Sequence, residues 1–357
     1  MTGEGKTVDM GYLKDKFDPS DMYDVISSLP NQIEEAGEIA EEFDLQTDID
    51  NISNILFAGM GGSAIGGDLV KSIMEAESSI PVSVVRNYLL PAWADKTTLA
   101  IISSYSGNTE ESISAYHDAK KRGCRIVCAG TGGEIGRLAE SNKNPLLNLP
   151  KGLPPRGAIA YSSIPWLVIF SSMGLISDKS SEIQQAVQTL KKLAELNGDI
   201  NSDAEGSALN TAGKLKGKIP LIYVSSGSFG VIGKRWANQI QENAKMPAYY
   251  NELPEMNHNE IMGWYLSGLA DESVVPLFLY SGLYHERVKL RFDITSRLVK
   301  EKGGNPVRID APEGNLLTQL LGLINFGDFV SYYLALLNNV DPGPVDLIAE
   351  LKKELAK

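Results

Sequence analysis

Short apolar runs alternate with longer segments of helical periodicity along most of the chain. In the first half, these runs predict strands at 54–58, 81–86, 99–103, 125–129 and 146–149. Amphipathic helices are expected after the first, third and fourth of them. Strands that alternate with helices at this spacing are typical of βαβ units in a parallel sheet. Because βαβ connections are right-handed, we expect helices on both faces of the sheet.

The same alternation restarts after a polar helical stretch at 177–216, which we expect to bridge two domains. Strands are predicted in this second half at 220–225, 247–251, 274–280 and 306–309. An apolar helix follows each set of strands, at 159–174 and 316–337, and the longer helix could supply a subunit interface. The repeat indicates a duplication, with an N-terminal domain over residues 1–185 and a C-terminal domain over 186–357. The predicted fold class is α/β: two domains, each a mainly parallel five-stranded sheet between helical layers, as in flavodoxin-like and Rossmann-like folds.

Further helices are expected at both ends of the chain. Residues 10–43 are predicted to be helical with a break near Pro30, and a last helix is expected to run to Lys357. In open parallel sheets, ligands bind beyond the carboxyl ends of the strands. The Gly- and Ser-rich turns of both halves follow such strand ends, so the sequence predicts its binding sites there.

Composition narrows the classes of partner. The 357 residues carry a net charge of −12, which argues against nucleic acid and anionic membranes as partners. The apolar run at 164–176 is too short to cross a bilayer, and residues 1–6 lack the apolar core of a signal peptide. Cys124 and Cys128 are expected on one face of one strand, where they would not form a disulfide. Reduced, buried thiols favour a cytoplasmic protein.

The turn at 104–109, Ser-Tyr-Ser-Gly-Asn-Thr, joins a buried strand directly to a helix. Backbone N–H groups of a first helical turn, together with the helix dipole, form an anion site. One hydroxyl would be enough to cap the helix, but this turn holds Ser104, Ser106 and Thr109. No Lys or Arg lies in it. The turn therefore predicts a phosphate site built from dipoles and hydroxyl groups.

The earlier turn Gly59-Met60-Gly61-Gly62-Ser63-Ala64 matches the pattern G-x-G-x-x-A of dinucleotide-binding proteins. That pattern also requires an acidic residue at the end of the next strand to bind a ribose, and this strand ends with Arg86. Arg86 could meet a 2′-phosphate, so an NADP site stays open. A glycine turn that only packs strand against helix is a second interpretation. We favour a third, a phosphosugar loop in which Ser63 donates beside the 104–109 turn.

Two polar segments of the second half carry candidates for acid–base chemistry. Glu242 is expected near the end of a helix, where most glutamates are solvated. His258 lies at a loop-to-helix junction, between Asn257 and Asn259, where functional residues gather; a surface cap is the alternative. No metal site is expected, because the three histidines are scattered and no His-x-x-x-His pair occurs. A G-x-S-x-G nucleophile motif is also lacking.

Taken together, several motifs resemble one family, the bifunctional phosphoglucose/phosphomannose isomerases. Gly-Met-Gly-Gly-Ser at 59–63 and the serine turn are similar to the sugar isomerase (SIS) domain. More specific to the family are the segments Gln-Glu-Asn-Ala-Lys at 241–245, Pro-Glu-Met-Asn-His-Asn-Glu at 254–260 and Asp-Pro-Gly-Pro-Val at 341–345. The resemblance covers nearly the whole chain, including Asp-Met-Tyr-Asp-Val-Ile at 21–26.

The resemblance implies two SIS domains, a homodimer, and a metal-free isomerase that needs no cofactor. It implies that the phosphate of a sugar-phosphate substrate is bound by Gly61, Gly62, Ser63, Ser104, Ser106 and Thr109. Glu242 matches the family's catalytic base, and Arg156 matches the arginine beside the reacting carbons. His258 matches the ring-opening histidine, which reaches the site of the other subunit. Lys352 is preferred over the adjacent Lys353 as the lysine that assists ring opening.

These residue types suit an aldose–ketose isomerisation. A carboxylate can move a proton between C1 and C2 through an enediolate, and an arginine can stabilise the oxyanion that develops. An imidazole can deliver the proton that opens the sugar ring. The implied reaction interconverts glucose 6-phosphate and mannose 6-phosphate with fructose 6-phosphate.

Three alternatives stay open. The first is a phosphosugar-binding sensor without catalysis, against which the lack of a basic recognition helix counts. The second is an NADP-dependent reductase built on the 59–64 turn, which leaves the serine turn and the 254–260 segment unexplained. The third is an SIS enzyme that acts on another sugar phosphate, such as an amino-sugar isomerase or epimerase.

Overall fold

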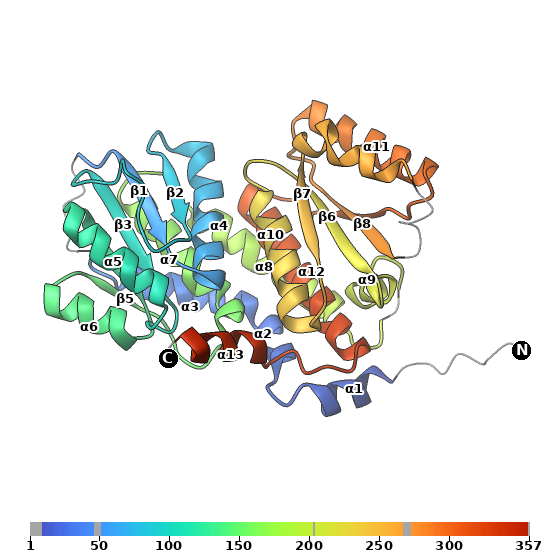
Figure 1. Ribbon diagram of the computed structural model, residues 1–357, viewed down its shortest axis with the longest axis horizontal. Coiled ribbons are helices and arrows are strands. Elements are labelled where there is room, and N and C mark those ends of the chain that lie inside the picture. Colours follow the sequence, from blue (N-terminus) through green and yellow to red (C-terminus); the bar gives the residue numbers. More distant parts are fainter. Residues whose placement is uncertain (1–8, 46–50, 203, 267–272, 356–357) are drawn as a thin grey trace, which may run out of the picture.

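The computed structural model describes residues 9–45, 51–202, 204–266 and 273–355. Figure 1 shows two lobes side by side, each with a sheet covered by helices. The sheet of the first lobe has the order β2-β1-β3-β4-β5, and all of its strands are parallel. These strands are β1 (Asn54–Ala58), β2 (Val82–Val85), β3 (Thr98–Ser103), β4 (Arg125–Gly130) and β5 (Leu146–Asn148).

Both faces of this first sheet are buried, as a parallel sheet requires. Along β3, Leu99 and Ile101 belong to the large core that the sheet shares with α4 (Gly61–Glu77) and α7 (Ile159–Ser172). Ala100 and Ile102 face a smaller core under α5 (Glu110–Arg122) and α6 (Gly133–Asn142). The α/β class is therefore confirmed, because successive side chains of one apolar run serve two different cores.

The second lobe contains four strands within the described residues, close to the four predicted positions, whereas the predicted fold class had five. Their order is β7-β6-β8-β9, again parallel. The strands are β6 (Ile219–Ser225), β7 (Tyr249–Leu253), β8 (Val274–Tyr280) and β9 (Val307–Asp310). The prediction of five was wrong because β9 leads almost directly into α12 (Leu316–Leu337). In the first lobe, α6 and β5 occupy the corresponding part of the chain.

Helix α12 is the buried centre of the second lobe, and this corrects two expectations. Its 22 residues are apolar enough to cross a bilayer by length and composition, which the sequence reading overlooked, but 94% of its most apolar window is buried inside the protein. The proposed use of 316–337 as a subunit interface is also wrong. The helix instead packs against α8 (Ser180–Asn197), α9 (Ala208–Leu215) and α10 (Gly230–Ala244).

Helix α8 contains the predicted domain boundary at 185/186 and packs on both α12 and α3 (Leu29–Glu41). The exact division of the chain therefore stays a prediction. The N-terminal helices are α1 (Met10–Phe17), α2 (Met22–Ser27) and α3, so a break at Ser28 precedes Pro30 as expected, and a second break separates α1 from α2.

The remaining elements are short or lie at the surface. They are η1 (Pro155–Gly157), η2 (Glu255–His258), η3 (Glu260–Trp264), α11 (Glu286–Glu301) and α13 (Asp346–Leu355).

Both cysteines are free, as predicted. Burial raises the pKa of Cys124 to about 11 and that of Cys128 to about 12.

Candidate active site

The hydroxyl turn lies where β3 ends, as predicted. Ser104 Oγ donates to Thr109 Oγ1 at 3.0 Å, and the Thr109 N–H points to Ser104 Oγ at 3.4 Å. Ser106 is exposed, and its Oγ faces the Asn108 N–H at 3.3 Å. The N–H of Ile113 bonds to the Thr109 carbonyl oxygen, which is the first hydrogen bond of α5. The N–H groups before it have no partner within the helix, as at any helix N-terminus.

The start of α4 lies against this turn. Ser63 Oγ accepts the Tyr105 N–H at 3.1 Å, which ties the two strand ends together. Gly61 has a positive φ of 49° and opens the helix three residues earlier than predicted. At Gly62 a Cβ atom would lie 2.4 Å from the Pro155 carbonyl oxygen, so only glycine fits. Hydrogen bonds therefore bring Ser63 to the turn that holds Ser104 and Thr109, and Gly62 packs against η1.

Arg156 follows Pro155 and is 5% exposed. Its Nη1 lies 3.6 Å from Oε2 of Glu242, although the two residues are far apart in the sequence. Burial lowers the pKa of the Arg156 guanidinium, and the carboxylate of Glu242 opposes that shift. The structure thus brings together two predicted catalytic residues, a buried cation and a carboxylate whose side chain is 29% exposed.

The C-terminal segment 341–345 supports this pair with backbone carbonyl groups. Arg156 Nη2 donates to the carbonyl oxygens of Pro342 and Gly343. Lys245 Nζ donates to the carbonyl oxygens of Glu242 and Pro344, each at 2.5 Å. These carbonyl contacts were not predicted, although the two motifs that meet here were both singled out. Sequence spacing alone does not reveal that 241–245 and 341–345 touch.

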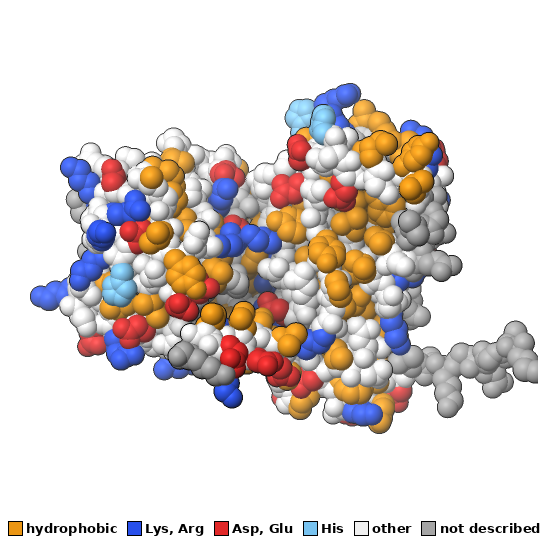
Figure 2. Space-filling view, in the orientation of Figure 1, with side chains coloured by type: hydrophobic (Ala, Val, Ile, Leu, Met, Phe, Trp, Pro, Cys, Tyr) orange, Lys and Arg blue, Asp and Glu red, His pale blue; other side chains and the backbone are white. Residues whose placement is uncertain are grey.

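A hollow of about 730 Å³ opens beside Glu242, a volume that suits a small-molecule site. It is lined by the end of α10 and by the start of α13, and Figure 2 shows the surface hollowed between the lobes above α13. Glu242 thus faces open space on one side and Arg156 on the other.

Two predicted residues are not part of this cluster. His258 is exposed at the end of η2, and Lys352 is exposed on α13. Among the described residues, no hydrogen bond or ion pair joins either side chain to Arg156 or Glu242. A single chain therefore brings Glu242 and Arg156 together without a contact to His258 or Lys352 among the described residues.

Arg86 does not present a free cation for a 2′-phosphate. Both of its terminal nitrogens bind the carboxylate of Asp68 on α4, and Lys234 Nζ lies 4.0 Å from the same carboxylate. This pairing counts against an NADP site. Within the described ranges, no group of three or more His, Cys, Asp and Glu side chains is arranged to bind a metal ion.

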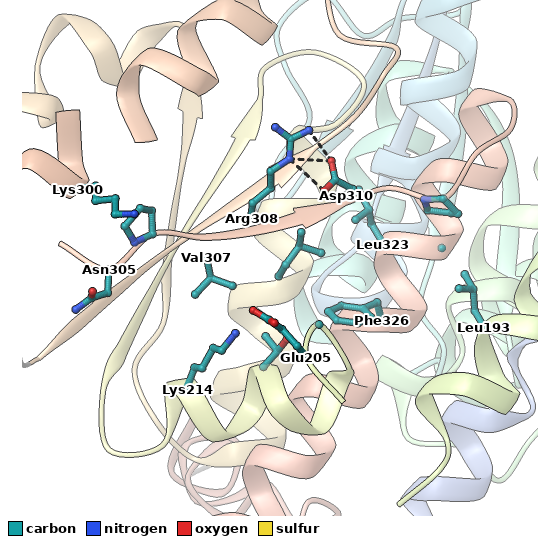
Figure 3. A pocket seen from close by; sticks show the side chains of 16 residues that line it. Leu193, Glu205, Lys214, Lys300, Asn305, Val307, Arg308, Asp310, Leu323 and Phe326 are labelled. Carbon is teal, nitrogen blue, oxygen red and sulfur yellow. Dashed lines mark hydrogen bonds and ion pairs between the residues drawn. The ribbon is translucent and has the colours of Figure 1, made fainter. Parts of the chain in front are cut away.

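A second hollow, of about 690 Å³, lies at the outer edge of β9 and contains none of the predicted site residues. Figure 3 shows Lys214, Lys300 and Glu205 around it, with Arg308 bonded to Asp310. Because β9 is the edge strand, a fifth strand of this sheet would pair with it on the side of this hollow. We find no link between this hollow and the Arg156–Glu242 pair.

Comparison with known proteins agrees with this geometry. A protein from Caldicellulosiruptor bescii named bifunctional phosphoglucose/phosphomannose isomerase is 39% identical over 94% of this chain and 99% of its own length. The chain belongs to the bifunctional phosphoglucose/phosphomannose isomerase family. A member from Aquifex aeolicus is 33% identical over the same shares of the two chains. The family model for the bacterial phospho-glucose isomerase C-terminal SIS domain matches residues 204–355.

More distant similarities extend beyond the family. A D-glucosamine-6-phosphate 4-epimerase from Sulfolobus acidocaldarius is 27% identical over 84% of this chain and 88% of its own. Among solved structures, the C-terminal domain of glucosamine-fructose-6-phosphate aminotransferase from Francisella tularensis superposes with a TM-score of 0.69. That match covers 92% of this chain and 99% of the other at 15% identity, so it supports the two-SIS-domain fold alone.

Proposed function

We propose that this protein is an aldose–ketose isomerase that interconverts glucose 6-phosphate and mannose 6-phosphate with fructose 6-phosphate. The observation that carries the proposal is the Arg156–Glu242 pair at 3.6 Å. The backbone at Pro155 and Arg156 packs against Gly62, one residue before Ser63, whose hydroxyl group bonds to the serine turn. Family membership supports the same reaction. The protein would act in carbohydrate metabolism in the cytoplasm.

The phosphate would bind Ser63, Ser104, Ser106 and Thr109 together with the backbone at Gly61 and Gly62. On fructose 6-phosphate, Glu242 would take a proton from C1, and negative charge would develop on O2 beside Arg156 Nη1. The same carboxyl group would return the proton to C2 while the hydroxyl proton passes from O1 to O2. Protonation on one face of the enediolate gives glucose 6-phosphate and on the other face mannose 6-phosphate.

Ring opening would require a second copy of the chain. His258 is exposed, and large apolar side chains near it are also exposed: Met262, Tyr265, Leu266, Leu290 and Ile294. Contiguous exposed apolar surface is typical of an interface. In the proposed homodimer this surface is covered and His258 reaches the site of the other subunit. Lys352, on α13 beyond the hollow, would assist in its own subunit.

The test is proton NMR of the EDTA-treated protein with fructose 6-phosphate in D2O. Both aldose phosphates should form, with deuterium at C2. Glucose 6-phosphate alone would remove the second activity but keep the mechanism. Binding without any product would favour a sensor. Turnover of glucosamine 6-phosphate in place of fructose 6-phosphate would assign the chain to another SIS reaction.

A further inference from the structure

The orientation of the Arg156 guanidinium is set on two of its three nitrogens. Nε donates to Asn243 Oδ1 at 2.6 Å, and Nη2 donates to the carbonyl oxygens of Pro342 and Gly343. Only Nη1 faces Glu242. Because the guanidinium is planar and its donors form a rigid fork, fixing Nε and Nη2 fixes the direction of Nη1.

The hydrogen bonds around Asn243 run in one direction. Its Nδ2 donates to Ser331 Oγ at 2.9 Å, and Ser331 Oγ donates to the Asp328 carbonyl oxygen at 2.8 Å. A carbonyl oxygen can only accept, so the one proton of Ser331 is committed and its lone pair faces Asn243. A flipped amide would set N–H against N–H at Arg156. Asn243 is 1% exposed and Ser331 is fully buried, so water does not offer another arrangement.

The charge beneath Arg156 is already balanced. Asp328 accepts from Arg235 Nη2 at 2.6 Å and from Gln239 Nε2 at 2.7 Å. The same Arg235 nitrogen donates to the Arg156 carbonyl oxygen at 3.0 Å. Asp328 is therefore matched by a cation of its own, and Arg156 directs its charge to the open side, where Glu242 lies. A neutral partner at Nε is needed for this, and Asn243 provides one.

We propose that Asn243 is a positioning residue, which through the chain Asp328–Ser331–Asn243 holds Arg156 so that Nη1 meets the oxygens of the reacting carbons. The inference rests on the proposed function. It explains why an amide follows Glu242: an aspartate would accept the same hydrogen bond but would set a second carboxylate against the guanidinium that Glu242 already pairs with. Asn243 acts only through Arg156, and the phosphate ligands lie elsewhere, so its loss should affect kcat far more than KM.

The experiment compares the variants Asn243→Asp and Ser331→Ala with the wild type. We expect kcat for fructose 6-phosphate to fall roughly 100-fold in Asn243→Asp, as for the loss of one oxyanion donor. A smaller fall, of about tenfold, is expected in Ser331→Ala, which frees the amide to flip. KM should change less than about threefold. Unchanged kcat in both variants would overturn the inference.

Binding of 5-phosphoarabinonate supplies a second readout, because its carboxylate imitates the charge of the enediolate. Asn243→Asp should weaken it by roughly the same factor as kcat. Asn325→Asp is the matched control, since it places a carboxylate at another buried asparagine, on α12 and away from Arg156; it should lower stability but leave kcat per folded molecule unchanged. A wild type without turnover would overturn the proposed function, whereas equal affinities of wild type and Asn243→Asp for the analogue would overturn this inference.

Discussion

At the scale of single residues, Glu242 and Arg156 differ in how they meet solvent. Arg156 is buried and bound on three sides, whereas Glu242 has a side chain 29% exposed that borders the hollow. A proton-transfer group must reach its substrate, and a stabilising cation must not be screened by water. The pair combines a fixed charge with an accessible carboxylate, as the proposed enediolate mechanism requires.

Replacing Glu242 by Gln should abolish turnover and leave phosphate binding intact. The amide has nearly the same shape but cannot accept the C1 proton, so kcat should fall by roughly 1,000-fold or more. Steady-state rates and calorimetric titration with fructose 6-phosphate measure the two effects separately.

Glu252→Gln is the matched control for Glu242→Gln. Glu252 lies at the other end of α10, near Gly230, and burial raises the pKa of its carboxyl group. This variant should keep turnover within about twofold of the wild type. Full activity in Glu242→Gln would show that another group takes the proton.

At the scale of secondary structure, the sequence predicted most strands, because apolar runs bounded by Gly, Pro and Ser specify them locally. All four apolar runs of the second half form strands, and the error lay in expecting five strands in both sheets. The sequence reading also missed the contact of Lys245 with the Pro344 carbonyl oxygen, which joins segments about 100 residues apart. A backbone carbonyl carries no sequence signal, so only the fold reveals this partner.

A buried lysine joins the end of α4 to the start of α8. Lys179 is 1% exposed and binds the carboxylates of Glu77 and Glu182. Burial opposes ionisation of Glu77, but hydrogen bonds from Lys179 and Ser177 outweigh it and lower the pKa of the carboxyl group. A carboxyl group whose pKa is lower in the folded state stabilises the fold at pH values above its ordinary pKa, which is 4.5 for Glu77. This stabilisation is lost as the pH falls through the folded-state pKa.

Lys179→Met should therefore lower the free energy of unfolding at pH 7 by about 1–3 kcal/mol. The difference from the wild type should narrow below pH 4.5, the ordinary value for the Glu77 carboxyl group. Urea unfolding at pH 7 and pH 4 measures both. Lys191→Met, on α8, is the control. The ion pair of Lys191 with Glu34 is about half exposed and should contribute less than about 1 kcal/mol to the free energy of unfolding. Equal effects of the two variants would contradict the prediction.

At the scale of the whole molecule, the two lobes share a topology, but the turns at their strand ends are filled differently. In the second lobe, the turn after β8 is filled by the side chain of Tyr284, which is 5% exposed. Its hydroxyl group donates to the Leu279 carbonyl oxygen at 2.8 Å and faces the Ser225 N–H at 3.4 Å. The start of α10 is occupied as well, since a Cβ at Gly230 would lie 2.6 Å from the carboxylate of Glu252.

The protein should accordingly bind one sugar phosphate per chain. In the second lobe, a phosphate would have to displace a buried tyrosine and approach a carboxylate, whereas the first lobe offers open hydroxyl groups and first-turn N–H groups. Isothermal titration with glucose 6-phosphate measures the stoichiometry, and Ser104→Ala combined with Thr109→Val should weaken the only binding event. Two equivalents per chain, or one that this double variant leaves unchanged, would place the phosphate site in the second lobe and contradict the assignment of the serine turn.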